Sequence, residues 1–193
     1  MGLAKSRSSA SSAAGFSLIE VLIATLILAV ALVSLAQLFA LSTRTNISAR
    51  NTTYTAVLAQ QKLEELRALT WGFDLQGLPV SDTTTNTAVS PETAGGGTGL
   101  APSPAGTLGA NTDGYVDYVG QFGNKLGGGG APPAGTVYVR RWSVEPLPSN
   151  PNNTVILQVL VFRNRDRGSA DDGAGTVLPD EARLVTVKTR KSQ

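Results

Sequence analysis

The sequence predicts an α+β fold in which one long N-terminal helix packs on a small antiparallel β-sheet. Three observations lead to it. No charged side chain lies between Val21 and Leu41, and about 20 apolar residues are enough for a helix to cross a hydrocarbon core of about 30 Å. The chain then continues to Leu69 without Pro or Gly. After a Gly- and Pro-rich stretch, apolar residues recur at every second position, which is the spacing of strands.

Residues 1–15 have the character of a leader. They are rich in Ser and Ala and carry Lys5 and Arg7, which favours a cytoplasmic N-terminus under the positive-inside rule. The alternative is an ordinary secretory signal, which has a shorter apolar region of about 7–15 residues and small residues at its cleavage site. Ala36 to Ala40 fits such a site poorly, because large residues lie between the alanines. We therefore expect the apolar segment to be retained.

One carboxylate, Glu20, stands at the start of the apolar segment. An acid at mid-membrane costs about 2.5–3.5 kcal/mol on insertion scales, less near the interface, and usually has a partner. The residues around it, Gly15-Phe16-Ser17-Leu18-Ile19-Glu20-Val21-Leu22-Ile23-Ala24, resemble the N-terminal signature of type IV prepilins and pseudopilins. The alternative is a plain signal anchor whose glutamate extends to the headgroups.

The resemblance implies a processing site and an assembly residue. A peptidase would cut after Gly15 and methylate the new N-terminal Phe16, and Glu20 would pair with the N-terminal amine of a neighbouring subunit. A charge pair costs less in a dry helix bundle than a lone charge does. The implied partners are other pilin subunits, the prepilin peptidase and methyltransferase, the inner-membrane assembly platform and the lipid bilayer. The implied location is the bacterial inner membrane, crossed once, and then a surface pilus or a periplasmic pseudopilus.

We expect residues 16–41 to form the transmembrane and assembly part of the helix and residues 42–71 its amphipathic second half. The stretch 16–69 would extend roughly 80 Å at about 1.5 Å per residue. A hinge within 42–51 that divides it into two helices is the alternative. Gly72 is the expected C-cap.

The second half of this helix has a broad apolar face. Two stripes at helical spacing make it up: Tyr54, Val57, Leu58 and Gln61, and Ala56, Ala59, Leu63 and Leu66. The residues expected mostly opposite are Gln60, Lys62, Glu64, Glu65 and Arg67. The segment 58–67 also resembles the same part of minor pilins of the PilV type. Gln37 occupies the place of a proline found in many major pilins, which favours a minor subunit.

Residues 72–114 are expected to form a variable, solvated loop rich in Gly, Pro and Thr, too polar to bury a face. An adhesive loop, or one glycosylated on Ser and Thr, is the alternative. Residues 115–193 are expected to form the antiparallel sheet, with strands at 115–122, 136–144, 154–162 and 183–190 and a loop from Gly127 to Pro133. The strand 154–162 is nearly all apolar, as in a central strand. Arg140 and Arg141 are expected to protect a sheet edge by charge, with anion binding as the alternative.

The segment 164–182 is acidic, with Asp166, Asp171, Asp172, Asp180 and Glu181. Calcium takes 6–8 oxygen ligands in proteins, but EF-hand spacing is absent, and arginines lie beside these acids at Arg163, Arg165 and Arg167. A charged, solvated loop is therefore expected, with calcium binding as the alternative. We predict neither a metal site nor a cofactor.

The composition excludes several function classes. The chain has no Cys and no His, which excludes disulfides, Cys-based metal sites and Ser-His-Asp catalysis. Apart from Lys5 and Arg7, basic and acidic side chains are equal in number, and no basic patch with aromatics indicates nucleic-acid binding. Together with these exclusions, the resemblance implies a structural minor pilin, not an enzyme, which assembles into or primes a type IV pilus. The alternatives are a pseudopilin of a type II secretion system and a membrane-anchored surface binding module.

Overall fold

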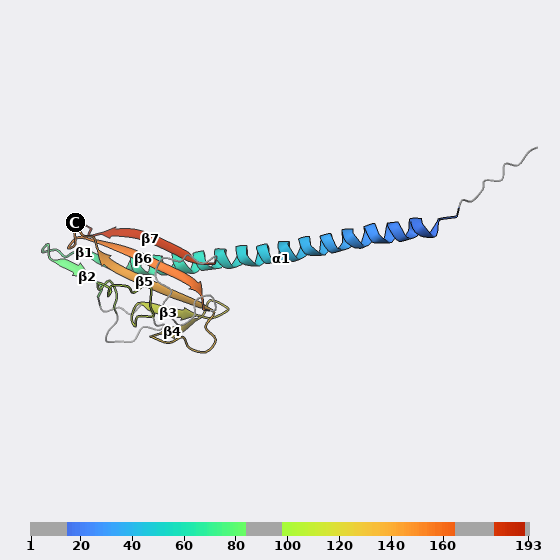
Figure 1. Ribbon diagram of the computed structural model, residues 1–193. Helices are drawn as coiled ribbons and strands as arrows, with labels where there is room; N and C mark the ends of the chain where they lie inside the picture. The colour runs from blue at the N-terminus through green and yellow to red at the C-terminus, as the bar shows by residue number, and fades with distance from the viewer. Residues whose placement is uncertain (1–14, 84–97, 165–179, 192–193) are drawn as a thin grey trace, which may run out of the picture. The chain divides into compact units, whose positions relative to one another are not determined.

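The computed structural model describes residues 15–83, 98–164 and 180–191 (Figure 1). The chain divides into two compact units, residues 1–46 and 47–193. One helix, α1 (Leu18–Ala68), contributes residues to both units and is not interrupted between 42 and 51. The alternative of two helices separated by a hinge is therefore not found. Residues 1–14, most of the expected leader, lie outside the described residues.

The second unit contains two antiparallel sheets. A small hairpin joins β1 (Trp71–Phe73) to β2 (Pro79–Ser81). The larger sheet has five strands in the order β4-β3-β5-β6-β7. Their bounds are β3 (Val116–Val119), β4 (Lys125–Gly128), β5 (Tyr138–Pro146), β6 (Thr154–Arg163) and β7 (Ala182–Thr189). The predicted fold class, a long helix on an antiparallel sheet, is confirmed.

The C-terminal part of α1 covers one face of this sheet, where the larger core forms. Leu58, Ala59 and Leu66 of the helix pack there against apolar side chains of the two longest strands: Tyr138, Trp142, Val144, Val155, Leu157, Val159 and Val161. These strand residues alternate along the chain because side chains of a strand point to opposite faces. Strand β6 lies between β5 and β7, as its apolar sequence predicts.

The opposite face of the sheet is also buried over parts of β3, β5 and β6, which the sequence did not predict. Val139, Leu160 and Phe162 form a second core there, with Leu108 and Leu126 packed against it. Residues 98–114 help to cover the domain: Leu100 and Thr107 are 1% and 2% exposed. The expectation of a wholly exposed loop over 72–114 is therefore wrong for the part from 98 onward. It also overlooked the β1–β2 hairpin, whose strands of three residues each are too short to show an alternating pattern.

Two further expectations are corrected near the ends of elements. Gly72 lies in β1 and is not the C-cap; instead the Lys188 ammonium of β7 donates hydrogen bonds to the carbonyls of Arg67 and Leu69. A cation at a helix C-terminus satisfies free carbonyls and stabilises the helix dipole. The strand expected at 115–122 is shorter: β3 ends at Val119. A turn follows it, and β4 pairs back on β3 and includes Gly127 and Gly128 from the expected loop.

Arg140 and Arg141 do not protect a sheet edge, because β5 lies between β3 and β6. Arg141 is 8% exposed and donates to the Asn111 side chain and the Leu108 carbonyl. Arg140 is fully buried and donates two hydrogen bonds to Asp117, at 2.7 and 2.6 Å. Adjacent residues of one strand thus send their guanidinium groups to opposite faces.

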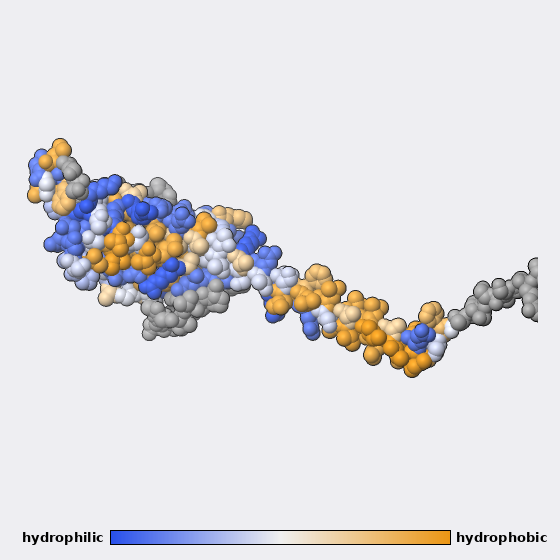
Figure 2. All heavy atoms as spheres, turned by 90° about the horizontal axis from the view of Figure 1, so that it is seen from above, coloured by the Kyte–Doolittle hydropathy of each residue, from blue (hydrophilic) through white to orange (hydrophobic). Residues whose placement is uncertain are grey.

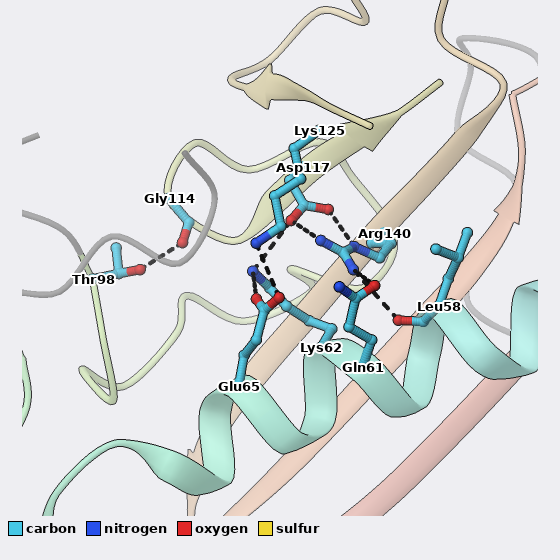
Figure 3. Close-up of polar contacts among 9 residues, drawn as sticks. All are labelled: Leu58, Gln61, Lys62, Glu65, Thr98, Gly114, Asp117, Lys125 and Arg140. Carbon is cyan, nitrogen blue, oxygen red and sulfur yellow. Dashed lines mark hydrogen bonds and ion pairs between the residues drawn. The ribbon is translucent and has the colours of Figure 1, made fainter. Parts of the chain in front are cut away.

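Lys62, expected on the polar face of α1, is fully buried and completes a charged cluster with Asp117 and Arg140 (Figure 3). Its ammonium lies 3.2 Å from Asp117 and 3.2 Å from Glu65, which also pairs with Lys125 at 2.9 Å. The same ammonium lies 3.9 Å from the centre of the Trp142 ring. We call Lys62, Glu65, Asp117, Lys125 and Arg140 the Asp117 cluster. It joins α1 to β3, β4 and β5 through charge.

The Asp117 cluster predicts a pH dependence of stability. Burial lowers the pKa of Lys62 below its ordinary value, and this outweighs the attraction of Asp117. The unfolded chain then holds more protons than the folded one, so the free energy of unfolding rises as pH approaches 10.5. Lys62→Met should flatten this rise; denaturant titrations of the full-length protein in micelles at pH 7, 8 and 9 measure it.

The pH range in that experiment matters because other groups titrate nearby. Burial raises the pKa of Tyr115, Tyr118 and Tyr138, so their ionisation in the unfolded chain reduces stability from about pH 10 upward. Burial also lowers the pKa of Lys188. A smaller rise of the free energy of unfolding with pH should therefore remain in Lys62→Met. If the free energy of unfolding rose equally with pH in the wild type and in Lys62→Met, burial would not be lowering the pKa of Lys62.

Candidate functional site

The N-terminal end of α1 is built by the residues Gly15 to Glu20. Gly15, Phe16 and Ser17 precede the helix, and the Ser17 carbonyl accepts the backbone N–H groups of Glu20 and Val21 at 3.0 and 3.2 Å. Ser17 is thus the N-cap residue, and Glu20 stands three positions later, the spacing of a capping box. A carboxylate in the first turn also favours the helix by interacting with its dipole.

Phe16 and Glu20 lie on one face of the chain, four residues apart. Both are exposed, Phe16 at 82%. Together with Val21, Ala24, Thr25 and Leu28 they line a shallow groove on α1. Glu20 takes part in none of the ion pairs among the described residues. Within the described residues, Glu20 thus has no counter-charge of its own.

The apolar segment that follows is exposed throughout. Every Leu, Ile, Val and Phe side chain from Phe16 to Leu41 is between 49% and 85% exposed, and Figure 2 shows this apolar surface along α1. The helix is long and apolar enough to cross a membrane. Thr25 and Ser34 donate their hydroxyl hydrogens to the helix carbonyls of Leu22 and Val30 at 2.9 Å, so these hydroxyls need no water. The segment is consistent with membrane anchoring.

The acidic segment 164–182 is described only at its two ends, residue 164 and residues 180–182. Asp166, Asp171 and Asp172 lie outside the described residues. Asp180 accepts hydrogen bonds from the side chains of Ser48 and Asn51 at 3.0 and 3.3 Å. Within residues 15–83, 98–164 and 180–191, no group of three His, Cys, Asp or Glu side chains is arranged to hold a metal ion.

Sequence reasoning missed one pocket. Arg50 of α1 and Arg163 of β6 line it together with Tyr54 and Tyr138. No motif marks these residues, and Arg50 and Arg163 are 113 positions apart in the sequence. Only the packing of β5 and β6 on α1 brings them together. The sequence alone does not show which strand residues lie beside Arg50.

The comparisons with known proteins agree with the geometry of the N-terminal segment. The profile of the prokaryotic N-terminal methylation motif matches residues 10–36. No curated protein and no solved structure matches the chain. Proteins with this motif are structural and not enzymatic. The motif implies processing by prepilin peptidase and assembly with other pilins. The matched motif and the helix-on-sheet fold together support a type IV pilin-like protein.

Proposed function

We propose that this protein is a minor pilin, inserted in the bacterial inner membrane with its N-terminus in the cytoplasm and assembled into a type IV pilus or priming it. The observation that carries the proposal is the lone carboxylate of Glu20 at the tip of an exposed apolar helix. Such a surface must be covered by lipid or by other apolar helices. A carboxylate at its tip then needs a cation brought by a neighbour.

The proposed mechanism begins with cleavage after Gly15. Phe16 becomes the N-terminal residue, its amine is methylated, and that amine remains a cation one helical turn from Glu20. In the filament, the Glu20 carboxylate of one subunit pairs with the Phe16 amine of the next. The apolar side chains of residues 16–41 exchange contact with lipid for contact with neighbouring helices. This exchange is nearly neutral in hydrophobic energy, so the charge pair fixes the register of the subunits.

Two features favour a minor subunit over the main filament subunit. The segment 58–67 resembles minor pilins of the PilV type, and Gln37 stands where many major pilins have a proline. The second candidate is a pseudopilin of a type II secretion system, which would have the same fold and the same N-terminal chemistry. Neighbouring genes would distinguish the two systems.

The experiment that tests the function follows the protein from membrane to filament. Surface filaments sheared from cells should contain the mature protein as a small fraction of all pilin, and deletion of its gene should reduce filament number. Deletion that leaves filaments intact but stops export of secreted proteins would favour the pseudopilin. A protein found only in membranes, with both processes intact, would favour an anchored binding module and contradict the proposal.

Gly15→Val should block removal of the leader. Gly15 lies in the non-helical segment before α1, and a Cβ added to it would meet no other atom within 4 Å. The substitution therefore changes the peptidase substrate and leaves the folded unit unaltered. Mass spectrometry should find the wild type beginning at methylated Phe16 and the variant beginning in the leader. Gly72→Ala, far from the cleavage site, is the control. A variant of normal mature mass would overturn the assignment.

A further inference from the structure

The pocket missed by the sequence lies in the second unit, where α1 passes beside β5 and β6. Its volume is about 440 Å³. The residues that line it are Ile47, Arg50, Asn51 and Tyr54 of α1, Gln121 of the turn between β3 and β4, and Val137, Tyr138 and Arg163. The rings of Tyr54 and Tyr138 lie 5.0 Å apart and form one wall.

The pocket carries two positive charges and no carboxylate among its lining residues. Neither Arg50 nor Arg163 forms an ion pair within the described parts of the chain, and Nε of Arg163 is buried without a hydrogen-bond partner. The nearby acid Asp180 already accepts hydrogen bonds from Ser48 and Asn51, and Glu181 follows it. A buried donor without an acceptor is unfavourable, and guanidinium groups bind phosphate oxygens with two parallel hydrogen bonds.

The position of the pocket along the chain points to the source of the phosphate. Ile47 follows Leu41, the last residue of the apolar segment, by six residues, and six residues cannot extend beyond about 20 Å in any conformation. The pocket therefore lies close to the membrane surface whenever the apolar segment is inserted. Basic side chains attract anionic lipids when they lie within about a Debye length of a leaflet that contains them, and Arg44 precedes Arg50 there.

An exposed aromatic side chain next to the pocket supports a lipid over a soluble ligand. Phe122 is 89% exposed and follows Gln121 in the turn between β3 and β4. Gly123, at φ 80°, lets this turn approach α1, since a Cβ there would lie 2.9 Å from the Tyr54 hydroxyl. The turn is thus held beside the pocket. Exposed Phe side chains are among those that enter the boundary between headgroups and acyl chains when a protein surface lies on a membrane.

We propose that this pocket binds the phosphate headgroup of an anionic phospholipid while the subunit is in the membrane. Arg50 and Arg163 bind the phosphate, and Phe122 enters the interface beside it. The inference goes beyond the proposed function: it requires membrane insertion but not filament assembly. A failed assembly test would leave it standing, and a failed lipid test would leave the assembly proposal standing.

The test uses the full-length protein in neutral detergent micelles, titrated with phosphatidylglycerol or phosphatidylcholine and followed by native mass spectrometry. Phosphatidylglycerol should bind preferentially. The variant Arg50→Gln/Arg163→Gln should bind it about thirty-fold more weakly, because each arginine near a membrane surface contributes about a factor of five. Arg50→Gln alone, on an exposed side chain, should lose about a factor of five and guards against misfolding of the double variant. Phe122→Ser should weaken binding of the lipid as well.

The control variant is Arg67→Gln/Arg183→Gln, which removes two exposed arginines outside the pocket and should bind phosphatidylglycerol like the wild type. Equal binding of the two lipids, or full binding by the double pocket variant, would overturn the proposal. Glycerol 3-phosphate that binds as tightly as the lipid would overturn the lipid source and leave a pocket for soluble phosphates. Defective filaments with unchanged lipid binding in the pocket variant would mean that a neighbouring subunit occupies it, which also overturns the proposal.

Discussion

Glu20→Ala should leave the protein inserted and processed but keep it out of filaments. The substitution makes the segment more apolar, so insertion is not impaired, and the Gly15–Phe16 bond is untouched. In the filament, the neighbouring Phe16 amine would lose its counter-charge in a dry helix bundle. Leaving one partner of a buried pair alone costs about 3–5 kcal/mol, or at least about a hundred-fold in the incorporation equilibrium. The mature protein in sheared filaments, relative to that in membranes, measures the effect.

Two matched variants separate charge from shape at this position. Glu20→Gln keeps the size of the side chain and removes its charge, and it should fail to incorporate as Glu20→Ala does. Thr25→Val changes a neutral side chain in the same groove and should incorporate normally. Wild-type amounts of Glu20→Ala or Glu20→Gln in filaments would refute the pairing.

Asp117→Asn should strongly destabilise the second unit. Asp117 is fully buried and is the acceptor of two hydrogen bonds from Arg140 and the anion beside Lys62. The amide would leave two buried cations without their shared anion, which costs about 3–5 kcal/mol. Domains of ordinary size have about 5–15 kcal/mol of stability, so a large fraction would be lost. Denaturant unfolding of the full-length protein in micelles, followed by tryptophan fluorescence, measures the change.

An exposed ion pair and a double variant provide the controls. Glu64 pairs with Arg67 at 3.0 Å, with both side chains more than half exposed, and Glu64→Gln should cost less than about 1 kcal/mol. Lys62→Met/Asp117→Asn should lose less than the sum of its single variants, because Lys62→Met removes one of the two cations that share Asp117. Strictly additive losses would mean that the two side chains do not interact.

The elements that follow from local pattern are those that the sequence predicts well. The apolar segment 16–41 and the helix-forming residues to Leu69 correspond to α1, and the alternation in 136–144 and 183–190 corresponds to β5 and β7. These patterns depend on near neighbours only. The roles of Gly15, Phe16 and Glu20 rest on a short motif that the family profile also matches, and they stay predictions until the mature N-terminus is measured.

What the sequence could not predict depends on contacts between distant segments. Helical spacing puts Lys62 on the polar face of α1, where lysine is usually exposed, and only the arrival of Asp117 from β3 makes its burial possible. Alternation cannot reveal strand order, so it cannot show that Arg140 lies in the interior of the sheet. Residues 98–114 contribute to both cores, Leu100 to the one under α1 and Leu108 to the one on the second face of the sheet, and their Gly and Pro content conceals this. Each of these errors concerns a partner far away in the chain.

The hydrogen bonds from Lys188 to the end of α1 have a consequence for the order of events during biosynthesis. Arg190 extends the same connection by donating to the carbonyls of Gly72 and Val80. Lys188 follows the carbonyls that it closes by 121 and 119 residues. Until β7 has been synthesised, the last carbonyls of the helix must be hydrated by water, and β6 lacks its outer neighbour. The end of α1 therefore acquires its hydrogen-bond partners only after all the strands of the larger sheet are present.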